Sequence, residues 1–142
     1  MRHPYVFRPK VVGVVLAILT GPLSAQVSAD PLDGTEWEVV TARGASLLPG
    51  THFYIRFDEG RVTGNAGCNG FFGGYEVRGD SVAVTDVAAQ KMMCHEPAGL
   101  MGQESYLLQF LAEVRTFRLD GDRLRLRRPD GEALTLLPRP IE

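Results

Sequence analysis

The sequence lacks the features of several common classes of protein. Its 142 residues include only two cysteines, Cys68 and Cys94, and its formal net charge is −2 rather than strongly positive. No cysteines or histidines have the C-x-x-C or H-x-x-x-H spacing typical of zinc sites. No linker, fixed-period repeat or low-complexity segment interrupts residues 30–142. These absences argue against a zinc-finger module, a repeat protein and, because of the charge, a nucleic-acid-binding protein.

Long hydrophobic runs are also missing, apart from a short one near the amino terminus. Basic residues come first, an apolar run follows over residues 11–19, and small residues continue to Ala25 and Ala29. This order is typical of a secretory signal peptide, and the run is too short for a permanent transmembrane helix. We expect a signal peptide over residues 1–29, cleaved after Ala25 or Ala29, and a mature domain over residues 30–142. No cysteine lies near the cleavage region, so we expect a periplasmic or secreted protein without a lipid anchor.

The expected mature domain alternates apolar and polar residues with a period of two, interrupted by turn residues. This pattern predicts short antiparallel strands. A two-residue turn at Glu59-Gly60 would pair Phe57 with Val62 and keep one face of that hairpin apolar. Near the carboxyl end, a three-residue loop would pair Leu126 with Leu134. About eight such strands are expected.

One segment has the period of a helix instead. Apolar residues recur there at intervals of three and four: Leu100, Leu107, Leu108, Leu111 and Val114. The spacing predicts an amphipathic helix with Pro97 near its first turn. Eight strands with one helix before the last three predict a mainly β (α+β) fold. We expect an antiparallel meander that curls into an open barrel, with the helix plugging or flanking it.

The two cysteines allow three interpretations. In an exported protein, two thiols that can approach each other usually form a disulfide, and a loop of this length would add about 3.5 kcal/mol of stability in the chain-entropy model. A zinc site would need both cysteines together with His52 and His95. A catalytic thiol at Cys94 would need His95 as its base, but adjacent residues of a strand point apart. The disulfide is favoured, and the other two remain alternatives.

The residues around both cysteines resemble a known family. A G-x-x-G-C-N core, a downstream M-x-C and a helix carry the resemblance, through Gly64, Gly67, Cys68, Asn69, Gly74, Tyr75, Met92, Cys94, Pro97 and Glu104. Over Leu32 to Leu137 the chain is similar to the META domain, the HslJ-like family of small bacterial envelope proteins. The resemblance implies an incompletely closed barrel with one helix, a disulfide between the two cysteines and no established enzymatic activity. It also implies a broad link to heat shock, antibiotic tolerance and motility.

Three polar positions of this motif call for specific partners. Gln90 stands where family members often have threonine, so a hydrogen bond from that threonine is not expected. Glu104 lies on the apolar stripe of the predicted helix and needs a donor, either Arg115 or a backbone amide. A carboxylate in a cleft can also mark a working site, so a functional role for Glu104 stays open. Asn69 is expected to cap a turn through its side-chain amide.

The last hairpins should carry a basic outer face. Its residues are Arg118, Arg123, Arg125 and Arg127, with Arg118 expected opposite Arg123. Like charges on opposite strands are mildly unfavourable. Two interpretations follow. The arginines form a solvent-exposed face and interact with acidic neighbours, or they bind an anionic partner such as lipid headgroups or an acidic protein surface. Arginine at a sheet edge also discourages aggregation.

These features favour a non-enzymatic, exported, disulfide-bonded protein, expected to be a monomer. It would support the cell envelope or its stress response by binding an envelope protein or lipid. No cofactor, metal or catalytic residue is assigned, because no nucleophile, base and oxyanion donors assemble in the sequence. The alternative is a carrier of a lipid or other small apolar ligand inside the open barrel, lined by Phe53, Phe57, Tyr75 and Phe117. A core filled by side chains would argue against the carrier.

Overall fold

The computed structural model describes residues 13, 21–22 and 29–140 of the chain. The expected signal peptide therefore lies almost entirely outside the described residues, as does Ala25, one of its two expected cleavage positions. Within the part that is described, no helix has both the length and the apolar character needed to cross a membrane.

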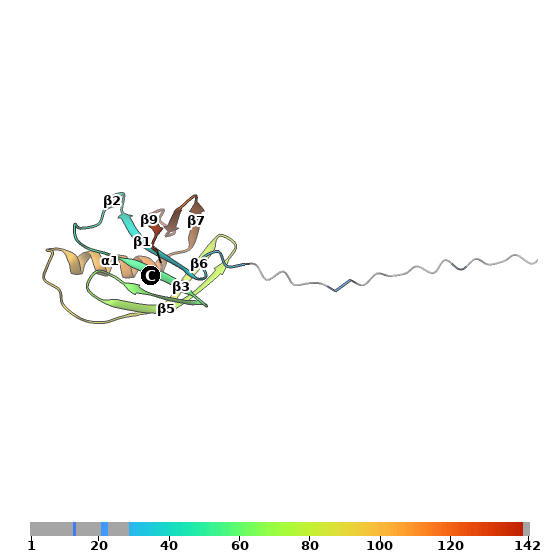
Figure 1. Cartoon of the computed structure of the whole chain (residues 1–142), viewed down its shortest axis with the longest axis horizontal. Coiled ribbons are helices and arrows are strands. Elements are labelled where there is room, and N and C mark those ends of the chain that lie inside the picture. Colours follow the sequence, from blue (N-terminus) through green and yellow to red (C-terminus); the bar gives the residue numbers. More distant parts are fainter. Residues whose placement is uncertain (1–12, 14–20, 23–28, 141–142) are drawn as a thin grey trace, which may run out of the picture.

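Strands dominate the described chain, with one helix late in the sequence (Figure 1). In chain order the elements are β1 (Thr35–Ala42), β2 (Ala45–Ser46), β3 (Tyr54–Asp58), β4 (Arg61–Asn65), β5 (Gly70–Arg78), β6 (Ser81–Ala89), α1 (Leu100–Glu113), β7 (Thr116–Asp120), β8 (Arg123–Arg127) and β9 (Ala133–Pro138). Because β2 has only two residues and pairs with the end of β1, eight strands build the main sheet. The helix precedes the last three strands, which confirms the predicted order.

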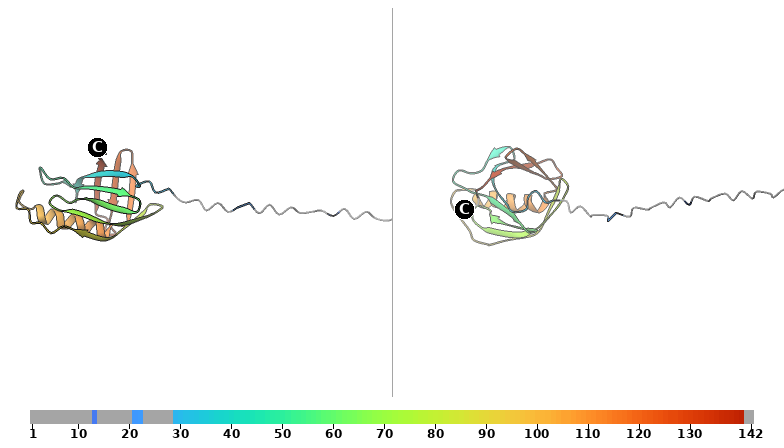
Figure 2. Two further views of the ribbon diagram at one scale, coloured as in Figure 1. Left: turned by 60° about the horizontal axis from the view of Figure 1, so that its bottom comes forward. Right: turned by 45° about the vertical axis from the view of Figure 1, so that its right-hand side comes forward.

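The sheet curls into a barrel. Neighbouring strands pair antiparallel in chain order, and β1 pairs a second time with β9, which closes the ring. The right-hand view of Figure 2 shows the strands as a ring that α1 crosses in projection. The seam between β6 and β7 has a single residue pair, Ser81 with Thr116, and α1 packs against β6. The predicted open barrel with one helix is confirmed, and the opening lies at this seam.

The hairpin registers follow the turn chemistry. Phe57 pairs with Val62 and Leu126 with Leu134, as predicted. The β7–β8 hairpin differs from the prediction: Arg118 lies opposite Arg125 rather than Arg123. Its turn uses Gly121 and the following aspartate as central residues, with Gly121 at a φ of 60°. A glycine at the first central position favours this two-residue turn, which shifts the pairing by two residues.

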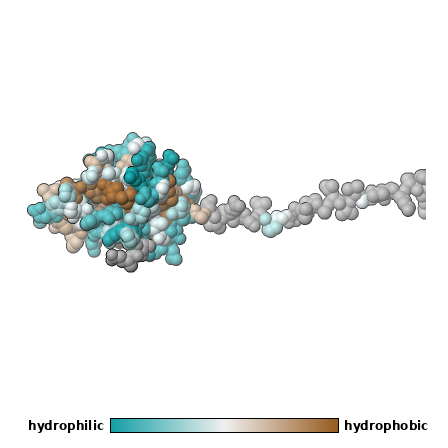
Figure 3. Space-filling model, turned by 45° about the horizontal axis from the view of Figure 1, so that its top comes forward, coloured by the Kyte–Doolittle hydropathy of each residue, from teal (hydrophilic) through white to brown (hydrophobic). Residues whose placement is uncertain are grey.

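Side chains fill the interior of the barrel. Phe53, Phe57 and Ile55 from the β3 region are completely buried, and α1 contributes Leu107 and Phe110 to the same core. Phe53 stacks on Phe71 with 5.5 Å between ring centroids. The face drawn in Figure 3 is mostly hydrophilic, with an apolar zone across its middle.

Candidate functional site

The two cysteines form a disulfide. Their Cα atoms lie 5.9 Å apart, and the bond joins the loop between β4 and β5 to the segment that leads into α1. Both thiols are therefore consumed, which removes the zinc site and the catalytic thiol from the alternatives. His52, the other imagined zinc ligand, contacts Glu38 through Nδ1 at 2.6 Å. Among the described residues, no group of three or more histidines, cysteines and acids is placed to hold a metal ion.

Glu104 anchors the helix to the disulfide loop. Its side chain is only 3% exposed, and Oε2 accepts hydrogen bonds from the backbone amides of Cys68 at 2.9 Å and Asn69 at 2.8 Å. Oε1 accepts a third bond, from Asn69 Nδ2. The donors are thus backbone amides, one of the two expected possibilities. Arg115 instead donates to the backbone oxygen of Val114.

Asn69 does not cap a local turn. It is 1% exposed, and its amide makes a two-sided bridge to Met92: Oδ1 accepts from the Met92 backbone N–H at 2.8 Å, and Nδ2 donates to the Met92 carbonyl at 3.1 Å. A buried amide needs partners for both its donors and its acceptor, and here these lie far along the chain. The local cap comes from Asn65, whose Oδ1 accepts from the Gly67 amide at 2.8 Å. We name Cys68, Cys94, Asn69, Met92 and Glu104 the disulfide cluster.

Gln90 makes two hydrogen bonds to Gly70, at the position where family members often have threonine. Its backbone N–H donates to the Gly70 carbonyl at 3.0 Å, and its side-chain Oε1 accepts from the Gly70 amide at 3.1 Å. The longer amide side chain therefore prolongs the pairing of β5 with the segment after β6. The departure from the family pattern keeps the two segments together.

Two glycines of the motif are required by close packing. A Cβ at Gly64 would lie 2.0 Å from the Tyr54 carbonyl oxygen, and one at Gly67 would lie 2.8 Å from Leu100 Cδ1. Gly67 also has a φ of 114°, which other residues rarely adopt. A third, Gly74, lies just beyond the irregular step in the β5–β6 pairing. These glycines bring the disulfide loop against α1 and the neighbouring strand.

The remaining motif residues are Tyr75, Pro97 and Met92. Tyr75 is buried, and its ring packs edge to face with that of Phe57, with 4.9 Å between the ring centroids. Its hydroxyl donates to Asp30 Oδ2 at 2.7 Å. Burial, and next the carboxylate of Asp30, raise the pKa of Tyr75 above its ordinary value. The Pro97 carbonyl accepts from the Leu100 amide at 3.1 Å, where α1 begins. Met92 is fixed through its backbone, and its side chain is exposed.

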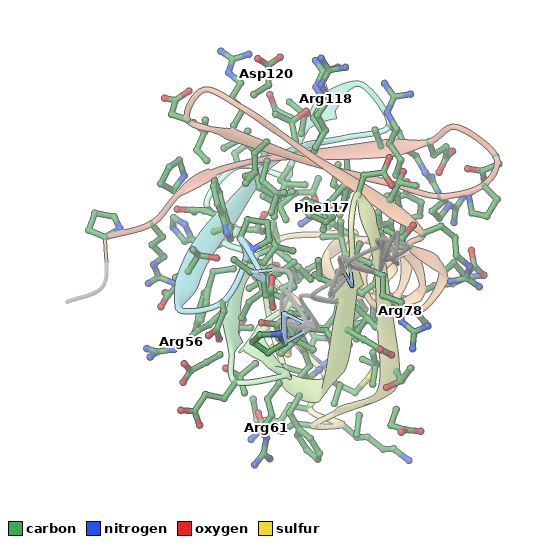
Figure 4. All side chains as sticks on the ribbon, turned by 90° about the vertical axis from the view of Figure 1, so that its right-hand side faces the viewer. Arg56, Arg61, Arg78, Phe117, Arg118 and Asp120 are labelled. Atoms are coloured by element: carbon green, nitrogen blue, oxygen red, sulfur yellow. A yellow bond between two sulfur atoms is a disulfide. The ribbon has the colours of Figure 1, made fainter. Side chains whose placement is uncertain are left out.

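The structure gathers three of the four predicted arginines in one groove. Arg118, Arg125 and Arg127 line a groove of about 620 Å³ on the outside of β7 and β8, together with Thr116, Asp80 and Asp120. Arg123 lies outside it, opposite Asp120. Figure 4 shows Arg118 pointing away from the barrel. We name this feature the arginine groove.

Within the described residues, the arginines of this groove form no ion pair. The ion pairs formed by arginines in the described part of the chain use Arg56, Arg78, Arg128 and Arg139. Arg118, Arg125 and Arg127 take part in none of them, although Arg118 and Arg125 are direct cross-strand neighbours. Like charges in this position are mildly destabilising. Asp80 and Asp120 line the same groove but form no ion pair with these arginines.

Arg128, in contrast, forms ion pairs with three carboxylates. Its guanidinium contacts Glu113 at 3.0 Å, Asp130 at 2.5 Å and Glu132 at 2.8 Å. The hydrogen bond to Asp130 raises the pKa of Arg128. The pKa of Asp130 is lowered by the backbone N–H of Glu132 and next by Arg128. The sequence contains no local signal for this network, because three carboxylates converge on Arg128 from two segments.

The aromatic residues expected to line a carrier cavity pack instead into the core. Phe53, Phe57, Tyr75 and Phe117 are all buried. Phe53 and Phe57 each lie against another aromatic ring. Two grooves, of about 600 and 620 Å³, lie on the outer surface of the barrel rather than inside it.

Fold and cluster together define the class of this protein: a small antiparallel β-barrel with one helix and a disulfide that ties the helix to the sheet. The family model described as META domain matches residues 30–140. The chain therefore belongs to the META domain family. No curated protein matches it significantly.

Several solved structures share the fold. An NMR structure of a protein from Burkholderia xenovorans is 20% identical, with a TM-score of 0.62 over 87% of this chain and 100% of that one. A second NMR structure is 21% identical, with a TM-score of 0.61 over 75% and 90% of the two chains. A crystal structure of a DUF4847 family protein from Bacteroides vulgatus is 14% identical, with a TM-score of 0.55 over 79% and 96%. At these identities the likeness shows the fold alone.

Proposed function

We propose that this META domain protein is exported and non-enzymatic, and that it supports the cell envelope by binding an anionic component through the arginine groove. The observation that carries the proposal is the set of unpaired arginines. Three guanidinium groups line one groove without an ion pair, in a chain whose formal net charge is negative. Arg118 and Arg125 are direct cross-strand neighbours that repel each other mildly, and a bound anion would remove this repulsion.

Phosphate-bearing lipid headgroups fit the groove best among envelope anions. A guanidinium presents paired N–H donors that match phosphate oxygens, and neighbouring arginines can share one phosphate. Arg118 and Arg125 are neighbours of this kind, and the Thr116 hydroxyl is a further polar group at the edge. Asp80 and Asp120 also line the groove and oppose an anion, so three arginines are needed to make the site attractive.

Binding at the surface is better supported than a carrier or a catalytic role. The aromatic residues that a carrier would use fill the core, and the disulfide occupies the two thiols that a nucleophile or a metal would use. The most buried carboxylate, Glu104, is occupied by three hydrogen bonds from the disulfide loop. The proposed role in envelope stress rests on the family resemblance alone.

Vesicle sedimentation tests the proposed binding. The oxidised protein is mixed with phosphatidylglycerol vesicles or phosphatidylcholine vesicles at low and high salt. We expect binding to the anionic vesicles only, weakening as salt screens the charges. Arg125→Gln should weaken binding about fivefold, since a basic residue near an anionic surface contributes about 1 kcal/mol.

Arg61→Gln is the matched control for this variant. Arg61 is also exposed and forms no ion pair in the described part of the chain, but it lies on β4, away from Arg118 in Figure 4. Equal loss in both variants would show a general effect of net charge and contradict the assigned groove. Binding to an acidic protein, with no affinity for anionic vesicles, would instead identify a different kind of partner.

Export has its own test. Amino-terminal sequencing of the protein recovered from the periplasm or medium should begin at Gln26 or Asp30, the residues after the two expected cleavage positions. A cytoplasmic protein that retains its first residues would contradict the export proposal.

A further inference from the structure

A second groove crosses the outer face of the barrel over strands other than those of the arginine groove. It has a volume of about 600 Å³ and lies over β3, β4 and β5, beside the ends of β1 and β9. Its lining includes the small residues Thr63, Gly64 and Gly70. Phe72 and Gln90 form one side of it, and Tyr54 and Arg139 contribute to the lining.

Phe72 is the unusual residue of this groove. Phe72 is 55% exposed. The preceding residue of β5, Phe71, points to the core and is buried against Phe53. The cross-strand neighbours of Phe72 are Thr63 on β4 and Ala88 on β6, both too small to cover an aromatic ring. A single exposed apolar side chain is common on protein surfaces. Phe72 differs because it lines a groove together with the hydrogen-bonding side chains of Thr63 and Gln90.

The charged groups of the groove are compensated. Arg139 Nη1 lies 3.5 Å from Glu36 Oε1, and its guanidinium stacks over the Tyr54 ring at 4.1 Å. Arg56 lies 3.6 Å from Asp58. The arginines therefore offer N–H donors without an uncompensated charge, in contrast to the arginine groove. A ligand that matches this lining is polar but uncharged.

Hydrogen-bonding groups surround the exposed ring. Gln90 uses Oε1 to accept from the Gly70 amide, which fixes its side chain and leaves its Nε2 group as a donor at the edge of the groove. The Thr63 hydroxyl and the Glu36 carboxylate add acceptors. Because Gly70 has no side chain, these groups can approach a flat ligand lying across the groove.

We propose that this groove binds a neutral carbohydrate chain. A pyranose ring has an apolar face of C–H groups and a rim of hydroxyls, so it can stack on Phe72 while Gln90 and Thr63 bond its hydroxyls. An anionic ligand finds no uncompensated charge here, and a purely apolar ligand would leave the polar groups without partners. The inference goes beyond the proposed function and does not depend on it, because the two grooves share no residue.

Titration followed by NMR tests the inference. The probes are three neutral tetrasaccharides: the β-1,4-linked tetramer of N-acetylglucosamine, cellotetraose and maltotetraose. They are added to the oxidised, ¹⁵N-labelled protein. We expect at least one of them to cause saturable shifts of the Gly64 and Gly70 amides and of the Gln90 side-chain amide.

Variants then separate stacking from unspecific contact. Phe72→Ala should weaken binding by about tenfold, because it removes the aromatic platform. Gly70→Ala should also weaken it, since Gly70 lines the groove and the added Cβ would lie 3.4 Å from Oε1 of Gln90, which lines it too. Met93→Ala is the control, because Met93 is 71% exposed and lies outside the groove.

Three results would overturn the carbohydrate site. The first is no shift of these amides by any of the three sugars up to their solubility limits. The second is a sugar affinity that Phe72→Ala leaves unchanged. The third is that an uncharged extended peptide saturates the same amides while the sugars do not. Loss of vesicle binding in arginine-groove variants should leave the sugar titration unaltered, so the two proposals fail separately.

Discussion

The disulfide cluster and the arginine groove differ in the burial and in the partners of their charged groups. In the cluster, the one carboxylate, Glu104, is buried and accepts three hydrogen bonds. In the groove, Arg118 and Arg125 lie directly opposite each other and have no ionic partner in the described chain. A buried group that makes its hydrogen bonds stabilises a fold. Exposed guanidinium groups are hydrated instead, and two of them directly opposite each other on neighbouring strands repel mildly.

The difference separates residues that hold this protein together from residues that are free to bind. Substitutions in the cluster should change the free energy of unfolding. Substitutions in the groove should change binding and leave the fold intact.

Glu104→Ala should destabilise the protein by about 4 kcal/mol, because the backbone amides of Cys68 and Asn69 and the Asn69 side chain would be buried without an acceptor. Urea unfolding measures this loss. Glu96→Ala is the control, since Glu96 is exposed, and should change stability by less than about 0.5 kcal/mol. Equal effects in the two variants would mean that the cluster is not a stabilising element.

Cys68→Ser and Cys94→Ser should each destabilise by about 3.5 kcal/mol, since either one releases the loop that the disulfide closes. The double variant should lose the same amount as each single variant, because all three lack the same bond. Melting temperatures measured without reductant provide the comparison. Clearly additive losses would contradict a shared bond.

Arg125→Gln should leave stability unchanged or raise it by a few tenths of a kcal/mol, because it removes the repulsion with Arg118. The same variant should lose affinity for phosphatidylglycerol vesicles, as proposed above. Urea unfolding and sedimentation on one preparation give both values. A marked loss of stability would show that the groove is part of the structural framework after all.

Asp130→Asn should destabilise the protein at neutral pH, and this difference should vanish in acid. The pKa of Asp130 is lowered in the folded state by the Glu132 backbone N–H and next by Arg128. Its contribution is therefore full above the ordinary aspartate value of about 3.9 and is lost as the pH falls through the lowered folded value. Melting temperatures of both proteins between pH 7 and pH 2 check the sign. A difference that persists at pH 2 would contradict it.

Local sequence pattern was sufficient to predict the strands, the helix and the cysteine pair. Alternation and turn residues act between near neighbours, which is why the pairing of Phe57 with Val62 could be predicted. The same reasoning paired Arg118 with Arg123 rather than Arg125, because the central residues of the β7–β8 turn are Gly121 and the aspartate that follows it. A small shift in a turn thus changed which arginines are neighbours.

The site itself was less accessible to sequence reasoning. Asparagine is a residue type that often caps turns. The partners of Asn69, however, are Met92 and Glu104, 23 and 35 positions away. The groove beside Phe72 depends on strand register and on which carboxylates reach Arg56 and Arg139, and neither is encoded locally. The family resemblance pointed to the residues of the disulfide cluster. The motif that carries it includes no residue of the arginine groove and gives no indication of the groove beside Phe72.

The most direct test of the central claim combines two measurements on the variant Arg118→Gln/Arg125→Gln/Arg127→Gln. Vesicle binding should fall by about two orders of magnitude, at about 1 kcal/mol for each arginine, while the free energy of unfolding stays the same or rises. A triple variant that is clearly less stable but still binds phosphatidylglycerol vesicles would contradict the separation of framework from binding surface.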